Sequence, residues 1–413
     1  MLTQTCPSQD LLLRSQADID EFAANYPRCV DIPKNLIIDE EVVGDIQSLV
    51  GLAQITTITQ SLEIRNNRAL TQLSGLEQLS AIGGNLLLLN NNSLQSLEGL
   101  AALEQIYGSF RIANDAELRD LNGLQQLDTI GQDLSLVSNT SLVKLSGLDS
   151  LSWIGGQFSI LSNPALTSLN GLNQLRAVGE VLQIYDNPIL QSLHALETLE
   201  TVGSDLIIDQ NIKLSGLNGL STLTSVGGFL QIVNNDQLTN ITSLINLREI
   251  NGLLQVYNNP VLSNLTGIDS VHWQSIQDLA LLSNASLSIC DVKSICQYLV
   301  IPSASYAIAE NLSGCSTRAQ ILASCDGDGL SSRPGQSNGI LLFPNPTLGV
   351  VKIKGRAMNG ARVEVIDSSG KRIYQTEVEE DGFQVQFIPA GFYTVHIWND
   401  RYSFYEPLIK LDL

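Results

Sequence analysis

Residues Leu62–Leu86 read LEIRNNRALTQLSGLEQLSAIGGNL, and the chain repeats this unit with a constant period. The next unit, from Leu86, reads LLLLNNNSLQSLEGLAALEQIYGSF. A fixed period of this length predicts a solenoid of about ten coils, in which each coil buries its apolar side by stacking on its neighbours. One polar position recurs every 24 residues, with a final step of 25: Asn67, Asn91, Asp115, Asn139, Asn163, Asn187, Asn211, Asn235, Asn259 and Asn284.

The spacing inside the unit indicates which kind of solenoid this is. After Asn67, apolar residues fall at every third position from Leu70 to Ile82. An α-helix needs a mixed spacing of three and four, so a strict three predicts extended or short 3₁₀ segments instead. The alternation in Leu62-Glu63-Ile64 is typical of a short strand. We therefore expect an all-β-dominated β-solenoid of 24-residue coils, with parallel strands forming a long sheet along one side.

The recurring Asn has a structural role in this scheme. An inward-pointing amide at a corner can bond the open backbone groups of its own turn and of the neighbouring coil. We interpret the ten positions as a structural ladder rather than as a row of ligand-binding amides.

Composition restricts the possible partners. The chain has 413 residues, 15% of them charged, and a net charge of −20, which argues against nucleic acid as a partner. No apolar run approaches the ~20 residues of a transmembrane helix, so no membrane span is expected. No motif for a cofactor or a metal is present, and we expect neither.

The cysteines lie outside the regular repeats. Their spacing matches no zinc site, and disulfides that tie down the two ends of the solenoid are the better interpretation, which implies an oxidising compartment. Cys6 is expected to pair with Cys29, whereas the other four allow three pairings. The disulfide candidates are Cys6, Cys29, Cys290, Cys296, Cys315 and Cys325.

Ser15-Gln-Ala-Asp18 predicts a capped helix to about Asn25, followed by Cys29, a strand and Leu-rich coils with an Asn corner. This arrangement, over roughly residues 10–325, resembles the receptor L domain family, relatives of leucine-rich repeats that form the ligand-binding lobes of hormone receptors. The resemblance implies a right-handed solenoid with short helical, disulfide-tied caps. We expect an N-terminal helical cap over 1–36, the solenoid over 37–289, a Cys-rich cap over 290–325 and a linker over 326–339.

The C-terminal part, residues 340–413, has a different character. Alternating segments such as Ala361–Ile366 and Phe392–Trp398, separated by turns, predict a small β-sandwich. Its sequence motifs resemble those of the type IX secretion sorting domain of Bacteroidota, among them Phe343-Pro-Asn-Pro-Thr-Leu-Gly349 and Pro389-Ala-Gly-Phe-Tyr393. The resemblance implies that residues 340–413 contact the type IX machinery and that the chain is secreted or displayed on the outer cell surface.

Catalytic chemistry finds little support in the sequence. The three histidines are far apart, and no nucleophile elbow, Walker loop or HExxH motif occurs. A carbohydrate-active β-helix enzyme would need carboxylates gathered on one face. The strand and corner acids instead occupy different columns: Glu63, Asp115, Asp186, Asp209 and Asp236. We therefore expect a protein that is not an enzyme.

The outward position two residues before each ladder residue is the expected binding site. Stacked strands would place its apolar members in exposed stripes, and exposed contiguous apolar surface usually marks binding. We expect the solenoid to recognise an extracellular protein or glycan there, as an adhesion protein; a lyase or hydrolase and a structural surface-layer protein are the alternatives. The candidate binding stripe consists of Leu89, Val137, Leu161, Tyr185, Val233, Tyr257 and Leu282.

Overall fold

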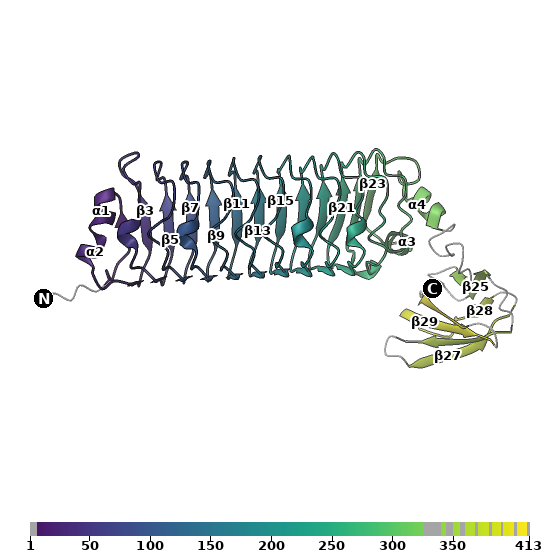
Figure 1. Cartoon of the computed structure of the whole chain (residues 1–413). Helices are drawn as coiled ribbons and strands as arrows, with labels where there is room; N and C mark the ends of the chain where they lie inside the picture. The colour runs from purple at the N-terminus through teal and green to yellow at the C-terminus, as the bar shows by residue number, and fades with distance from the viewer. Residues whose placement is uncertain are drawn as a thin grey trace. The chain divides into compact units, whose positions relative to one another are not determined.

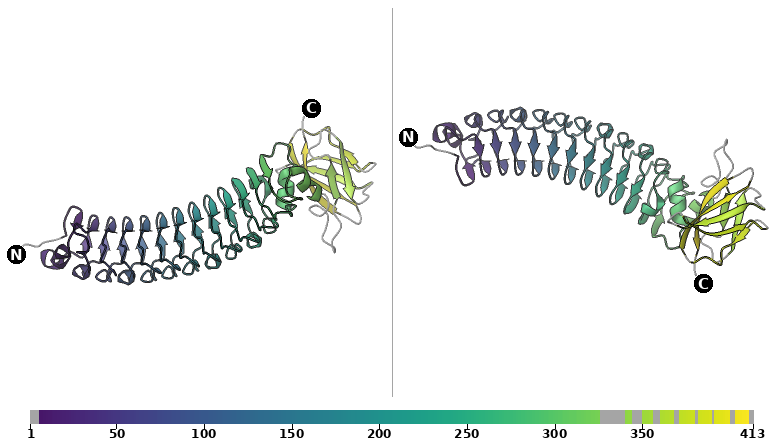
Figure 2. Two further views of the ribbon diagram at one scale, coloured as in Figure 1. Left: turned by 90° about the horizontal axis from the view of Figure 1, so that it is seen from above. Right: turned by 90° about the horizontal axis from the view of Figure 1, so that it is seen from below.

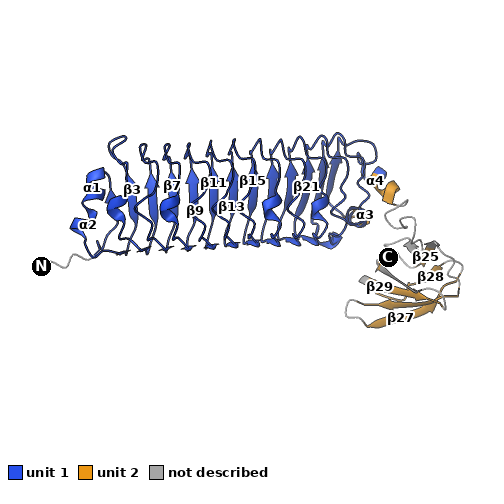
Figure 3. Ribbon diagram, in the orientation of Figure 1, with its two compact units in different colours: residues 1–298, 304–320 blue, residues 299–303, 321–413 orange. Residues whose placement is uncertain are grey.

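The computed structural model describes residues 6–325, 340–343, 350–355, 360–367, 371–379, 382–389, 391–399 and 403–410. The chain divides into two compact units, residues 1–298 with 304–320, and residues 299–303 with 321–413 (Figure 3). The predicted linker over 326–339 lies outside the described residues.

The first unit is a solenoid whose largest element is a parallel sheet of 13 strands (Figure 1). Each ladder of hydrogen bonds joins one coil to the next, and the register advances by one repeat per strand. Its strands are β1 (Leu11–Leu13), β3 (Leu36–Asp39), β5 (Leu62–Arg65), β7 (Leu86–Leu89), β9 (Phe110–Ala113), β11 (Leu134–Val137), β13 (Phe158–Leu161), β15 (Leu182–Tyr185), β17 (Leu206–Asp209), β19 (Leu230–Val233), β21 (Leu253–Tyr257), β22 (Asp278–Leu282) and β23 (Tyr306–Ala309). This long sheet confirms the predicted β-solenoid.

A second parallel sheet of 10 two-residue strands, which was not predicted, runs along another side of the solenoid. It arises because the last apolar residue of each return, such as Ile82, continues the extended backbone and pairs with its equivalents in the neighbouring coils. Its strands are β2 (Asp31–Ile32), β4 (Thr57–Ile58), β6 (Ala81–Ile82), β8 (Gln105–Ile106), β10 (Thr129–Ile130), β12 (Trp153–Ile154), β14 (Ala177–Val178), β16 (Thr201–Val202), β18 (Ser225–Val226) and β20 (Glu249–Ile250).

The returns between the two sheets follow the expected three-residue spacing. Leu70, Leu73, Leu76 and Leu79 are fully buried, as are their equivalents in the other regular coils. In four coils the return contains a 3₁₀ turn: η1 (Val50–Leu52), η2 (Glu98–Leu100), η3 (His194–Leu196) and η4 (Thr242–Leu244). A further one, η5 (Trp273–Ser275), takes the place of the short strand in its coil. Figure 2 shows the stack as gently curved, with these angular returns on the outer side of the curve and the long strands on the inner side.

A glycine in most returns allows the coils to approach closely. Gly147 has a φ of 112°, and a Cβ there would stand 1.9 Å from the carbonyl oxygen of Leu121 in the preceding coil. Its N–H donates to the Asp149 carboxylate over 2.8 Å, so the turn is closed by a side chain of the same coil. Only glycine fits at this position, because the backbone has a positive φ and there is no space for a Cβ atom.

The N-terminal end carries the predicted helix and disulfide. Ser15 and Asp18 form a capping box, and the helical segment is split at Glu21 into α1 (Gln16–Asp20) and α2 (Phe22–Asn25). Backbone N–H groups of Arg14 and Ser15 donate to Asp18, and the first of these is the main reason why the pKa of Asp18 is lowered. Cys6 is bonded to Cys29. The predicted cap also contains β1 and β2, which belong to the two sheets of the solenoid.

Replacing Ser15 with Ala is expected to lower the free energy of unfolding by about 1 kcal/mol, because the Asp18 N–H then loses the Ser15 hydroxyl that accepts it over 3.2 Å. Urea unfolding followed by circular dichroism measures the loss. Ser15→Asp restores an acceptor at the cap and should recover most of the stability, and equal losses in both variants would contradict the assignment.

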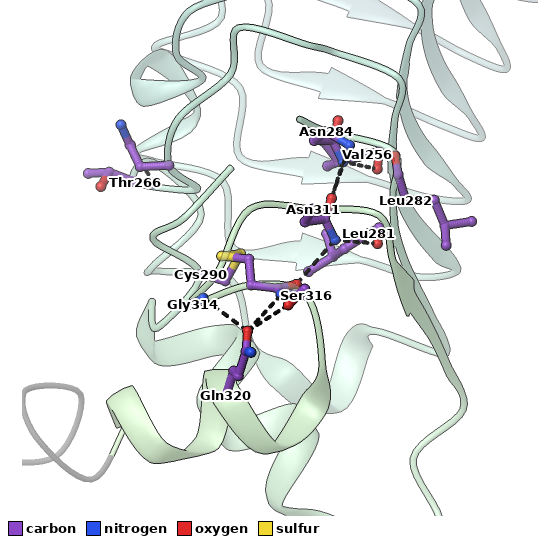
Figure 4. The surroundings of a disulfide bond; sticks show 12 residues. Val256, Thr266, Leu281, Leu282, Asn284, Cys290, Asn311, Gly314, Ser316 and Gln320 are labelled. Atoms are coloured by element: carbon purple, nitrogen blue, oxygen red, sulfur yellow. Dashed lines mark hydrogen bonds between the residues drawn. A yellow bond between two sulfur atoms is a disulfide. The ribbon is translucent and has the colours of Figure 1, made fainter. Parts of the chain in front are cut away.

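The C-terminal end of the solenoid is closed by one coil more than the repeat predicts. β23 pairs with β22, and Asn311, 27 residues after Asn284, donates to the Leu281 carbonyl over 2.7 Å (Figure 4). The Cys290–Cys315 disulfide lies beside this coil, and Gln320 of α4 (Arg318–Ser324) accepts the N–H of Gly314. Cys296, in α3 (Lys293–Val300), and Cys325 are also disulfide-bonded. The region expected to be only a cap therefore extends the long sheet.

The second unit contains two antiparallel sheets. One has three strands, β24 (Ile340–Phe343), β25 (Val350–Gly355) and β28 (Gly382–Gln384), and the other has four, β27 (Arg372–Glu377), β26 (Arg362–Ile366), β29 (Gly391–Trp398) and β30 (Ser403–Lys410). Val351 and Phe383 from the first sheet share one buried cluster with Val363 and Val395 from the second. This is the expected small sandwich.

Candidate recognition face of the solenoid

The ten recurring polar residues form a continuous inner ladder, here called the Asn ladder, and all ten are fully buried. Asn187 shows the pattern: its backbone N–H donates to Asn211 Oδ1 over 3.2 Å, and its amide nitrogen donates to the carbonyl of Ile160 in the preceding coil over 3.0 Å. The same two donations recur in most coils, and Asn311 extends the row by one position. These amides are occupied by backbone groups and are not accessible to a ligand.

The residue before each ladder position is a second special column that sequence reasoning missed. Eleven such residues have a positive φ between 52° and 61°, from Asn66 to Glu310. Asn, Asp and Ser predominate there because short polar side chains tolerate the left-handed region. Several side chains also bond along the solenoid, as when Asn90 donates to Asn66 over 3.0 Å. The sequence signal was the run of two adjacent polar residues in each corner.

Asp115 replaces Asn in the ladder and is the chemically unusual position in it. Its Oδ1 accepts the backbone N–H of Asn91 over 2.7 Å, whereas its buried Oδ2 has no hydrogen-bond partner. Burial raises the pKa of this carboxyl from 3.8 to about 7, against the lowering effect of the donor at Asn91. The group is closed to solvent.

The candidate binding stripe lies in a single column of the long sheet. The parallel register pairs Val137 with Leu161, Leu161 with Tyr185, and Val233 with Tyr257. A second outward column, from Glu63 through Ser135, Ser159, Gln183, Ile207 and Gln231 to Gln255, runs beside it. We refer to these two columns together as the outer face of the long sheet.

The members of the candidate binding stripe are not equally exposed to solvent. Tyr257 is 37% exposed, whereas Val233 is 9% exposed and counts as buried. Val233 is covered because it stands between two longer side chains in its column, Asp209 and Tyr257. The other five members are partly exposed: Leu89, Val137, Leu161, Tyr185 and Leu282. Asp209 separates the two apolar stripes, and the burial of Val233 departs from the exposure expected of the stripe.

Charge is unevenly distributed on the outer face. At its N-terminal end Arg65 bridges Asp39 over 3.0 Å and Glu63 over 3.3 Å. From Ser135 to Leu282 the two columns contain one charged residue, Asp209, in a chain with a net charge of −20. The rest of this part of the outer face consists of amide, hydroxyl and aliphatic side chains and two tyrosines.

The acids and the histidine considered for catalysis in the sequence lie at separate positions and bond to their own neighbours. The Asp186 carboxylate accepts a hydrogen bond from the Ser162 hydroxyl over 2.8 Å. The Asp209 carboxylate accepts one from the Asn234 amide over 2.9 Å, so each acid bonds to the corner of an adjacent coil. His194 contacts Glu197 over 2.8 Å in a single exposed 3₁₀ turn. Among the residues that the structure describes, no three His, Cys, Asp or Glu side chains are grouped as a metal site requires.

Comparison with known proteins identifies one part of the chain. Residues 341–410 match the family model of the secretion system C-terminal sorting domain. No curated protein matches the chain. Over the described residues, no helix is both long and apolar enough to cross a membrane. The sorting domain carries the type IX signal, and the chain is exported through that system to the cell surface or the extracellular space.

Proposed function

We propose that the solenoid is a non-enzymatic recognition module that holds an extracellular protein or glycan on the outer face of its long sheet. The observation that supports this most is the near absence of charge on that face from Ser135 to Leu282, in a strongly acidic chain. Solenoids commonly bind ligands on such extended sheet surfaces, because each coil adds one row of side chains at a fixed spacing.

The coil design also supports kinship with receptor L domains. A capped N-terminal helix precedes a disulfide at Cys29, and Leu-rich coils with a buried Asn corner follow. The sorting domain brings this module to the cell exterior, where it would act in adhesion or ligand capture.

Substituting Tyr185 and Tyr257 with Ser is expected to weaken capture of the ligand by about ten-fold or more, since aromatic anchors contribute most of the binding energy at such interfaces. Protein and glycan arrays probed with the full chain identify the ligand, and titration of both variants measures the loss.

Ile245→Ser serves as the control, because Ile245 is 57% exposed and directly follows η4, outside both columns of the outer face. If the Tyr185 and Tyr257 variants bind as tightly as the unchanged protein, the outer face of the long sheet is not the site. Turnover of a bound polysaccharide would instead favour the enzyme alternative.

A further inference from the structure

The short-sheet side of the solenoid exposes two aromatic side chains that its fold does not require. Tyr107 is 61% exposed and follows β8, and Trp153 is 44% exposed and begins β12. β10 lies between these strands, so the two residues stand two coils apart, about 10 Å along the solenoid. Exposed Trp and Tyr rings of this kind bury large apolar area at little entropic cost when they bind a ligand.

The column that contains Tyr107 otherwise lacks side chains over several coils. In five successive coils the position equivalent to Tyr107 is glycine: Gly131, Gly155, Gly179, Gly203 and Gly227. A Cβ at Gly131 would stand 2.1 Å from the Tyr107 carbonyl oxygen, and the other four meet the same obstacle at 2.0–2.1 Å. The packing of the coils therefore accounts for these glycines. Their consequence is a flat strip without side chains, here called the glycine row.

The Trp153 ring extends over this row. Its Cη2 lies 2.8 Å from the point where a Cβ on Gly155 would stand, so the indole covers Gly155 rather than projecting away from the sheet. Tyr107 occupies the same column directly beside Gly131. Trp153 belongs to the neighbouring column, which contains Thr129, and its ring reaches over the column of Tyr107, Gly131 and Gly155.

The border of the row is polar and acidic. Glu104, Asp128 and Asp133 are exposed on either side of the short strands, as is Gln132. Carboxylates and amides accept and donate the hydrogen bonds that sugar hydroxyls need, whereas the acids repel an anionic polymer. The flat strip, the spaced rings and the polar border together match a linear carbohydrate, in which apolar ring faces alternate with hydroxyl edges.

We propose that Tyr107, Trp153 and the glycine row form a binding site for a neutral, linear polysaccharide that lies along the solenoid axis. This site lies on the short-sheet side, and it does not depend on the face proposed above for ligand recognition. Two sugar rings stack on Tyr107 and Trp153, and the intervening chain passes over Gly131.

Affinity electrophoresis of the full chain in gels containing hydroxyethylcellulose, laminarin, xyloglucan or galactomannan tests this site, with alginate as the anionic comparison. We expect retardation by at least one neutral polymer and none by alginate. Trp153→Ala and Tyr107→Ala should each weaken that binding about ten-fold or more.

Thr129→Arg keeps both rings but places a long side chain on β10 between them, and it should also reduce binding. Ile245→Ala, at an exposed position directly after η4 and outside both proposed sites, should leave it unchanged. The proposal is overturned if no neutral polymer retards the protein, or if the Trp153 and Tyr107 variants bind as the unchanged protein does. Loss of self-association in these variants, without polysaccharide binding, would show that the strip joins two copies of the chain instead.

Discussion

Replacing Asp115 with Asn should raise the free energy of unfolding at pH 8 by several kcal/mol, on the order of 4 at most. The reason is local. Asn91 and Asn139, its neighbours in the Asn ladder, donate through their amide nitrogens to the carbonyls of Ile64 and Ile112. Asp115 presents an unpartnered oxygen, Oδ2, in place of that nitrogen. An amide at this position would supply the missing donor.

The stabilisation by Asp115→Asn should increase with pH. Burial raises the pKa of Asp115 to about 7 in the folded chain, from an ordinary value of 3.8. Between about pH 4 and pH 7 the folded state therefore holds a proton that the unfolded chain has released, so stability falls as pH rises through this window. Below pH 4 both states are protonated at this site, and above pH 7 both are ionised. The stabilisation by Asn should be small at pH 4 and reach its full size near pH 8.

Comparing the two proteins at each pH removes the contribution of the other acids, which both share. Urea midpoints measured by circular dichroism from pH 4 to pH 8 give the difference between them. Asp209→Asn is a matched control, because Asp209 lies on the outer face of the long sheet and is partly exposed. A difference between the Asp115 variant and the unchanged protein that stays constant with pH would contradict a buried, protonated carboxyl.

The sequence predicted the solenoid because one constraint repeats in every coil. Strict three-residue spacing from Leu70 to Ile82 excludes a helix, and the fully buried side chains of the returns follow from it. The second sheet was not predicted, since its strands are two residues long and carry no alternation of their own. The last coil was missed for a related reason: Asn311 follows Asn284 by 27 residues and so breaks the period.

Surface properties were harder to predict than the core. The column of the candidate stripe follows directly from the period, but the exposure of each member depends on the length of its neighbours across the strands, as at Val233. No pattern in the sequence indicated Tyr107 and Trp153 as an exposed aromatic pair, because the equivalent positions in other coils are mostly glycine and small residues. Their proximity depends on how the short strands pair, and no sequence pattern specified that pairing.

Substituting Asn187 with Ala should lower the free energy of unfolding by about 3 to 5 kcal/mol, because several buried backbone groups lose their partners at once. The carbonyls of Ile160 and Tyr185 each lose a donor at 3.0 Å, and the N–H of Asn163 loses its acceptor at 3.2 Å. No water replaces these bonds easily, since Asn187 is fully buried.

Urea unfolding of Asn187→Ala measures this loss, and Asn170→Ala, at an exposed position in the preceding coil, is the control that should change stability little. Asn187→Asp makes the test sharper, because it repeats at a second coil the exchange that Asp115 represents. It should be close to the unchanged protein at pH 4, where the carboxyl can donate its proton, and clearly destabilised at pH 8. A ladder built on amide donors requires both results: equal stability of the Ala and Asp variants at pH 4 would show that a hydrogen bond donated by the side chain at this position does not stabilise the stack, and would contradict the prediction.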